Sequence, residues 1–425
     1  MKKILEFKLK VLAKLVLKKY KPEIIGITGS VGKTSTKDAI YAVLQKKYRV
    51  RKSIKNYNNE IGVPLTIVGA ESAGRSLVKW TAVFVQALNL LIKKDKDYPE
   101  ILILEMGVDK PGDMAYLTKI AKCKVGVVTA VGTVHVENFG SIEGIQKEKF
   151  ELIKNVIPGG WSVINYDDEK TRKMIDMVTS KVITYGFDKK AQVRAEEIKY
   201  SFQAEEINGI SFKIFYNGSV VPVSLPKILS KASVYSALVG AAVGIVYDMN
   251  LVDIALALRD LESPIGRMKK IAGIKGTLII DDSYNAEPKS MNLAVETMAI
   301  LPLNEGAAKY AVLGDMLELG QYSEEAHREI GKLVFASNID YLITVGERSR
   351  DIGRGAKEAG MNKDFIFNFA TSEEAGKFLQ NRIKQDDLLL VKGSQGIRME
   401  KIVKELMANP IKAKELLVRQ GKEWK

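Results

Sequence analysis

Short apolar runs alternate with stretches of helical periodicity in two parts of the chain. Between Glu23 and Asn165 the runs read EIIGITG, ILILEMG, VGVVTAVG and WSVIN. In the second part they read TLIIDDS, KYAVLGDM, YLITVGE, FIFNFA and DLLLVKGS. Buried strands that alternate with helices are typical of βαβ units in a parallel sheet. The pattern therefore predicts two α/β domains, the second of them Rossmann-like.

A different pattern separates these parts. Residues 182–226 alternate polar with β-branched and aromatic positions and contain Asn-Gly pairs, which favours antiparallel strands with tight turns. Helices are expected at residues 232–247 and 251–261, and ESPIGRM then introduces proline and glycine, as in a hinge. We expect three parts, at residues 1–21, 22–265 and 266–425.

The first of these parts has the pattern of a basic amphipathic helix. Lysines interrupt its apolar stretch and no small-residue cleavage site follows, so it is not a signal peptide. Two interpretations stay open, namely a helix at the anionic inner membrane face and a helix packed on the next domain. Residues 81–92 are also strongly apolar, but they fall short of the ~20 residues that cross a bilayer, so a buried or surface-lying helix is expected.

The formal charge of +14 lies mostly at the chain ends. Residues 1–21 carry a net charge of +7 and residues 408–425 a net charge of +3, which leaves +4 for everything between. A basic ATPase that binds nucleic acid would carry its charge in its core, so this alternative is disfavoured and no nucleic-acid partner is expected. Cys123 is the one cysteine, which excludes an intramolecular disulfide and favours the cytoplasm.

The stretch GITGSVGKTST follows an apolar run and precedes a helical pattern. A strand, a glycine-rich turn and a helix N-terminus direct backbone N–H groups at an anion, and Lys33 and Thr34 add a cation and a metal-binding hydroxyl. A strict phosphate loop would have glycine at position 27, where this chain has Ile27. The strand–loop–helix context nevertheless predicts a nucleotide-binding P-loop.

Polar residues follow two further predicted strands. Glu105 ends ILILEMG and His135 follows VGVVTAVG, and ligands gather at the carboxyl ends of parallel strands. Glu105 could hold Mg²⁺ together with Thr34, since a hard cation prefers oxygen donors. Lys149 lies further along, in IQKEKFELI, where a solvated helix position would be the ordinary interpretation.

These motifs together closely resemble the Mur ligase family, specifically its MurF type. The match runs in order through TGSVGKTS, NYNNEIGVPLT, LEMG, HVENFGSIEGIQKEK, DDSYNAEPKSM, VLGDMLELG and VKGS…ME. The resemblance implies an ATP-dependent, ADP-forming amide ligase of peptidoglycan precursor synthesis, which joins D-alanyl-D-alanine to a UDP-muramoyl-tripeptide. It also implies a monomer. The usual N-terminal domain that grips the UDP-sugar is expected to be lacking, with the basic segment in its place.

The resemblance also assigns roles to residues. The ATP-binding positions it implies are Gly29, Ser30, Gly32, Lys33, Thr34, Arg267, Asp282, Tyr284 and Asn285. Thr34 and Glu105 would hold one Mg²⁺ and His135 a second, with Lys149 as a carbamylated lysine at the metal site. Asn58, Asn59 and Glu60 would line the substrate cleft. Lys33, Glu105, His135 and Lys149 are then the catalytic candidates.

The expected mechanism proceeds through an acyl phosphate and needs no nucleophilic side chain. Another Mur-type ligase, with a different carboxylate acceptor such as a folate, remains the alternative among enzymes.

Overall fold

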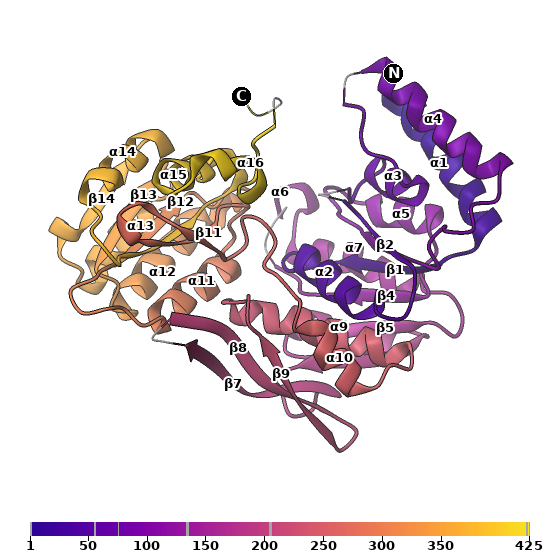
Figure 1. Ribbon diagram of the computed structural model, residues 1–425, viewed down its shortest axis with the longest axis horizontal. Helices are drawn as coiled ribbons and strands as arrows, with labels where there is room; N and C mark the ends of the chain where they lie inside the picture. The colour runs from indigo at the N-terminus through magenta and orange to yellow at the C-terminus, as the bar shows by residue number, and fades with distance from the viewer. Residues whose placement is uncertain are drawn as a thin grey trace. The chain divides into compact units, whose positions relative to one another are not determined.

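The computed structural model describes residues 2–54, 57–74, 76–132, 136–203, 206–421 and 424, and Figure 1 shows its course. The chain forms two compact units. The first comprises residues 1–199, 211–225 and 233–261, and the second comprises residues 200–210, 226–232 and 262–425. The three-part division with limits at residues 21 and 265 stays a prediction, because compactness does not test independent folding.

The first unit is built on a nine-stranded sheet with the order β2-β3-β1-β4-β5-β6-β7-β8-β9. Neighbouring strands from β2 to β7 pair in parallel. The buried apolar runs predicted this for β1, β3, β4 and β5. The strands are β1 Glu23–Thr28, β2 Val50–Lys52, β3 Ile101–Glu105, β4 Val125–Val128, β5 Trp161–Asn165, β6 Lys181–Gly186, β7 Val193–Gln203, β8 Glu206–Tyr216 and β9 Ser219–Leu225.

The segment expected to be antiparallel is so only in part. Asn217 and Gly218 both have positive φ, 46° and 78°, and connect β8 to β9, as in a two-residue hairpin turn. The other Asn-Gly pair, at residues 208–209, lies inside β8, so a turn there is wrong. The prediction is also wrong for β6, which pairs in parallel with β5.

Helices flank this sheet, and α7 packs on β1 and β4. The helices expected at 232–247 and 251–261 correspond to α9 and α10. In order, the helices are α1 Lys2–Tyr20, α2 Lys33–Leu44, α3 Gly62–Val68, α4 Leu77–Ile92, α5 Asp113–Ile120, α6 Val136–Phe139, α7 Ile142–Lys154, α8 Glu169–Arg172, α9 Lys231–Val246 and α10 Leu251–Leu258. Within the described ranges, no helix is long and apolar enough to cross a membrane.

The second unit has a six-stranded sheet with the order β10-β11-β15-β12-β13-β14. All its neighbouring strands are parallel except β10 and β11. The strands are β10 Lys269–Ala272, β11 Leu278–Asp282, β12 Lys309–Gly314, β13 Tyr341–Val345, β14 Ile366–Phe369 and β15 Leu388–Lys392. The helices are α11 Pro288–Ile300, α12 Ser323–Ala336, α13 Arg350–Ala359, α14 Ser372–Arg382, α15 Glu400–Leu406 and α16 Ala413–Leu416.

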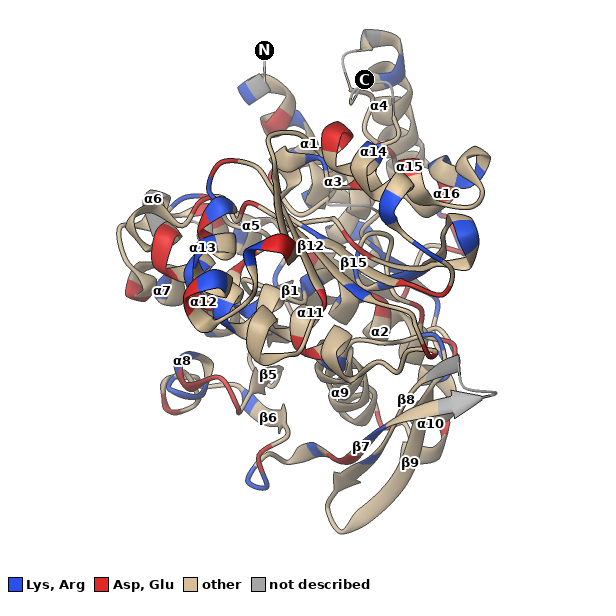
Figure 2. Ribbon diagram, turned by 90° about the vertical axis from the view of Figure 1, so that its left-hand side faces the viewer, with Lys and Arg blue, Asp and Glu red and all other residues tan. Residues whose placement is uncertain are grey.

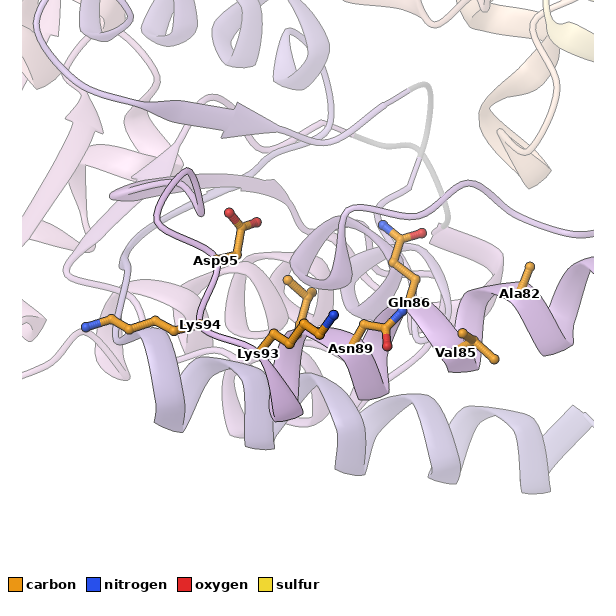
Figure 3. Close-up of a pocket in the computed structure, with 8 residues that line it drawn as sticks. Ala82, Val85, Gln86, Asn89, Lys93, Lys94 and Asp95 are labelled. Carbon is orange, nitrogen blue, oxygen red and sulfur yellow. The ribbon is translucent and has the colours of Figure 1, made fainter.

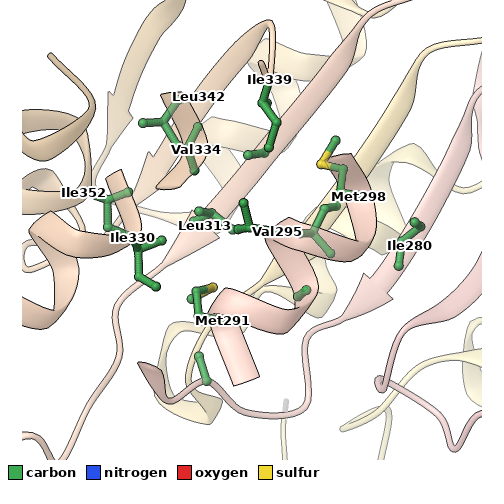
Figure 4. Close-up of a cluster of buried hydrophobic side chains, with 14 of the residues drawn as sticks. Ile280, Met291, Val295, Met298, Leu313, Ile330, Val334, Ile339, Leu342 and Ile352 are labelled. Atoms are coloured by element: carbon green, nitrogen blue, oxygen red, sulfur yellow. The ribbon is translucent and has the colours of Figure 1, made fainter. Parts of the chain in front are cut away.

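Apolar side chains fill the space between this second sheet and the helices on either face. On one face Val295 of α11 and Ile330 of α12 pack with Leu313 of β12, as Figure 4 shows. A second cluster on the other face joins α14 and α15 to the same strands. On the outer side, charges of both signs mix along α12 and α13 (Figure 2), where Arg328 pairs with Glu324 and Glu358. The Rossmann-like prediction is therefore confirmed.

Candidate functional site

The predicted phosphate loop lies between β1 and α2, in the first unit. Gly29 has a φ of 145° and Gly32 a φ of 82°, both in the region that favours glycine. A Cβ atom at Gly29 would lie 1.9 Å from Thr129 Oγ1, so no side chain fits there. Glycine at these positions lets the backbone turn sharply from strand to helix, which leaves the N-terminus of α2 open to an anion.

Side chains at the end of β4 fix this loop. Thr129 Oγ1 donates to Val31 O at 2.5 Å, and Gly132 N donates to Ser30 Oγ at 2.8 Å. Lys33 Nζ lies over the loop, 2.5 Å from Gly29 O and 3.2 Å from Ser30 O. The Lys33 cation is therefore held at the loop itself, where a bound phosphate would need it.

Glu105 stands beside this loop because β3 pairs with β1, with Glu105 opposite Ile27. Its Oε2 accepts a 3.2 Å hydrogen bond from Thr34 Oγ1. Lys37 Nζ lies 3.6 Å from the same oxygen, and both side chains are 3% exposed. Sequence reasoning missed Lys37, although it lies one helical turn after Thr34 and so shares its face of α2. The hydroxyl and the carboxylate form an oxygen pair that fits one Mg²⁺ ion.

The other predicted metal ligands are less well defined. His135 lies outside the described residues. Lys149, on α7, is 3% exposed, so a solvated position is excluded. Its neighbour Glu148 accepts hydrogen bonds from Gly112 N at 3.0 Å and Met114 N at 2.7 Å. Among the residues the structure describes, no group of three or more His, Cys, Asp or Glu side chains is arranged to hold a metal.

The three predicted cleft residues differ in their surroundings. Asn58 packs against Gly107, just after β3, and Gly107 N donates to Asn58 O at 2.8 Å. Asn59 Oδ1 instead accepts from the backbone N–H groups of residues 61 and 62, at 3.2 and 3.0 Å, where α3 begins. Glu60 is partly exposed. Asn58 thus lies close to the end of the strand that carries Glu105, whereas Asn59 stabilises the local turn.

In the second unit the structure brings Arg267, Asp282, Tyr284 and Asn285 together at the carboxyl end of β11. The Arg267 guanidinium lies 4.2 Å from the centre of the Tyr284 ring. Lys392 Nζ lies 2.7 Å from Asp282 Oδ2 and donates to Asn285 O at 2.9 Å. Burial raises the pKa of Asp282, and the Lys392 and Arg267 cations oppose this rise.

Sequence reasoning missed Lys392 and also a third cation at this cluster, Arg419. Arg419, in the C-terminal tail, is 5% exposed and pairs at 2.7 Å with the fully buried Glu400. Its guanidinium also donates to Ser283 O at 3.1 Å and to Tyr284 O. Glu400 ends the VKGS…ME match, but Arg419 belongs to no motif, and the two meet because the tail returns to β11. Arg419 therefore fixes the Ser283–Tyr284 backbone to Glu400.

Comparison with known proteins assigns most of the chain to two family models. Residues 27–78 and 83–244 match the Mur ligase middle domain, and residues 266–395 match the Mur ligase, glutamate ligase domain.

Three similar proteins are all described as the same kind of ligase, two by its full name and one by the abbreviation MurF. The UDP-N-acetylmuramoyl-tripeptide–D-alanyl-D-alanine ligase of Bacillus subtilis is 31% identical over 94% of this chain and 79% of its own. The ligase of the same name from Escherichia coli is 27% identical over 94% of this chain and 80% of its own. The MurF ligase of Thermotoga maritima in complex with ADP superposes with a TM-score of 0.76 at 27% identity, covering 94% and 83%.

These relatives correct one expectation about the site. The carbamylated lysine expected at position 149 is not supported, because that modification belongs to ligases of the MurC, MurD and MurE types. The resemblance of HVENFGSIEGIQKEK to the family identified the lysine at position 149. It did not distinguish MurF-type ligases from those that carbamylate this lysine. Lys149 is therefore best described as a buried amine on α7.

Proposed function

The chain belongs to the Mur ligase family, and on that premise we propose that it is an ATP-dependent, ADP-forming ligase that adds D-alanyl-D-alanine to a UDP-muramoyl-tripeptide. The product is a precursor of peptidoglycan. The observation that carries this proposal is the meeting of a phosphate loop with the Thr34–Glu105 pair at the ends of two adjacent parallel strands. That pair supports the proposal because it puts a hydroxyl and a carboxylate, the donors that Mg²⁺ prefers, beside the loop, and a structural glycine turn would not need them.

The first chemical step joins the acceptor to phosphate. A carboxylate oxygen of the tripeptide attacks the γ-phosphorus of ATP, a P–O bond forms, and the bond from that phosphorus to the bridging oxygen breaks to release ADP. The Lys33 cation and the N-terminus of α2 stabilise the charge that spreads over the transferred group. Bound Mg²⁺, held by Thr34 and Glu105, would supply further positive charge there.

The second step forms the amide. The amine nitrogen of D-alanyl-D-alanine attacks the acyl carbon, a C–N bond forms, the C–O bond to phosphate breaks, and the amine loses a proton to solvent. Because water also hydrolyses an acyl phosphate, the residues around it must exclude water. We assign Asn58 to the cleft wall, because it adjoins the end of β3 that carries Glu105.

In the second unit we assign Arg267, Asp282, Tyr284 and Asn285 to the nucleotide. Their arrangement supports this role, since a guanidinium stacked on an aromatic ring can bind both a base and a phosphate. We also propose that the chain acts as a monomer. The cytoplasm is the proposed location, because the reaction uses ATP and the buried thiol of Cys123 is free. Membrane contact by residues 1–21 is a separate proposal that involves a second helix.

The decisive assay measures ADP release with UDP-muramoyl-tripeptide and D-alanyl-D-alanine, each omitted in turn. We expect turnover only when both are present. Lys33→Ala, Thr34→Val and Glu105→Gln should each lower kcat by roughly 100-fold or more, because they remove groups that act mainly on the transferred phosphoryl group. Lys46→Ala is the matched control, because Lys46 is exposed and pairs with Asp260 on the surface.

Steady ADP release without an acceptor would contradict the proposal. Turnover with a folate or another carboxylate in place of the muramoyl peptide would keep the ligase chemistry but change the substrate.

A further inference from the structure

The amphipathic helix α1 is fixed to the first unit along one side. Leu9, Ala13 and Val16 are fully buried, in clusters shared with α3, α4 and β3. At its end, Lys19 Nζ donates to the carbonyl oxygens of Leu90 and Leu91 of α4, at 2.8 and 2.9 Å. Figure 1 shows α1 and α4 side by side. Because the C-terminal ends of α1 and α4 meet there, these neighbouring helices point in the same direction.

The outer side of α1 is apolar as well, which the amphipathic pattern of the sequence did not distinguish. Four side chains at helical spacing are exposed by 40–66%, namely Ile4, Phe7, Val11 and Leu15. On α4 four more are exposed by 48–81%, namely Val78, Val85, Leu88 and Ile92. The buried sides of both helices pack on one core cluster, which contains Leu9 of α1 and Val83 and Ala87 of α4. The two exposed stripes therefore point away from the same core, and together we call them the two-helix face.

Cations border the two-helix face. Lys3, Lys8, Lys14 and Lys18 are exposed on α1, and Lys79, Lys93 and Lys94 are exposed on α4 or directly after it. The sequence of α4 carries no acidic residue, and that of α1 carries only Glu6, which is partly buried. An exposed apolar stripe that is bordered by cations and has almost no acidic residue beside it is unusual on a water-facing helix and marks an interaction site.

A hollow of about 540 Å³ lies along α4, from Ala82 to the lysines at the end of the helix (Figure 3). Ala82, Val85 and Leu90 form the apolar part of its lining. Lys93 and Lys94 contribute two ammonium groups, and Asp95 contributes one carboxylate. Apolar surface beside an excess of positive charge is complementary to an anionic phospholipid, whose phosphate lies next to its acyl chains. A neutral protein groove would match the apolar stripes but not the lysines around them.

We propose that the two-helix face binds the surface of a membrane that contains anionic lipid. The apolar stripes enter the boundary between headgroups and acyl chains, and the bordering lysines contact lipid phosphates. Binding is peripheral, in keeping with the length and charge of both helices. It is independent of ligase chemistry, because none of these residues belongs to the phosphate loop, the Thr34–Glu105 pair or the Tyr284 cluster.

The test is co-sedimentation of the full chain with vesicles of phosphatidylcholine, alone or with 30% phosphatidylglycerol. We expect binding only to the anionic vesicles, and weaker binding as salt rises, because screening shortens the electrostatic reach to ~8 Å at physiological ionic strength. The triple variant Phe7→Ser, Val85→Ser, Ile92→Ser should bind at least tenfold more weakly. Lys14→Gln, Lys18→Gln, Lys94→Gln together should weaken binding to a similar degree.

Matched controls exist elsewhere on the chain. Met177, Val252 and Leu256 are exposed by 56–62%, and Lys189, Lys190 and Lys384 are exposed. The corresponding triple serine and triple glutamine variants should bind anionic vesicles like the original chain. All four variants should keep the original melting temperature and the original rate of ADP release without lipid.

Three outcomes would overturn the proposal. They are failure of the full chain to bind anionic vesicles at low salt, equal loss of binding in the control variants, and a lipid-free dimer that the Phe7, Val85, Ile92 variant converts to monomer. The last result would assign the face to a second copy of the chain.

Discussion

Asp281 is a fully buried carboxyl next to the nucleotide cluster of the second unit. Burial raises its pKa to about 6, and the neighbouring Asp282 and Glu400 carboxylates act in the same direction. The hydrogen bond from Ser283 N, at 3.1 Å, offsets only part of this rise. Because the folded-state pKa exceeds the ordinary value, Asp281 contributes stability that is present below about pH 4 and is lost as pH rises to about 6.

The variant Asp281→Asn should remove this pH dependence. Asparagine keeps the oxygen that accepts from Ser283 N and does not titrate. Between pH 4 and pH 8, the free energy of unfolding of the variant should therefore rise by about 2 kcal/mol relative to that of the original chain. Urea denaturation at both pH values, followed by fluorescence of Trp424 in the second unit, checks this. The exposed Asp364→Asn should show no relative change, and a similar change there would contradict the argument.

Lys149 gives a second prediction for a single residue. If its amine is not carbamylated, the enzyme needs no carbon dioxide. The rate of ADP release should then be the same in degassed, bicarbonate-free buffer and in buffer with added bicarbonate. Lys149→Ala should lose activity, because a buried amine and its contacts are removed, and added acetate or bicarbonate should not restore it. Rescue by a small carboxylate would instead show that an anion belongs at this position.

Among the helices, α5 depends on a side chain from another element. It begins after Gly112, which offers no side chain to cap the first N–H groups. The Glu148 carboxylate of α7 takes that place, since it accepts from Gly112 N and Met114 N. A negative charge at a helix N-terminus is also favourable to the helix dipole. One buried residue thus connects two helices that flank the sheet.

Replacing this cap should destabilise the first unit. Glu148→Ala leaves two backbone donors without their acceptor, and we expect a loss of about 1–3 kcal/mol. Glu143→Ala is the matched control, since Glu143 is exposed in the first turn of the same helix and its loss should cost less than ~0.5 kcal/mol. Urea denaturation followed by tryptophan fluorescence distinguishes the two. If both variants lost the same free energy of unfolding, Glu148 would act only through its negative charge on α7 and not as a cap of α5.

The sequence predicted those elements whose signal is local. β1, β3 and β15 are continuous buried runs, and their motifs end where the strands end. β2 and β10 were missed because each is short and contains two cations, so hydrophobicity does not mark them. The Lys37–Glu105 and Arg419–Tyr284 contacts were missed for a different reason. They depend on strand pairing and on the path of the tail, which no local pattern encodes.

At the scale of the whole molecule, each end of the chain is fixed to its own unit. Lys19 and Tyr20 connect α1 to the end of α4. At the other end, a Cβ atom at Gly266 would lie 3.0 Å from Val418 Cγ1, so the tail packs directly on the segment predicted to be a hinge. Arg419 then bridges Glu400 and the backbone of Ser283 and Tyr284. The tail therefore supports the loop that we assign to the nucleotide.

Arg419 should consequently act as a positioning residue for ATP. If Tyr284 and Asn285 contact the nucleotide, Arg419→Gln should raise the KM for ATP about tenfold, with less than ~3-fold change in kcat and none in the KM for D-alanyl-D-alanine. Arg419→Lys should restore little, since an ammonium group cannot reproduce the planar fork that reaches several acceptors. Arg398→Gln is the control, because Arg398 binds Glu400 and Trp424 O but not the Ser283–Tyr284 backbone. A purely structural role for Arg419 predicts instead that both variants lower the melting temperature and leave every KM unchanged.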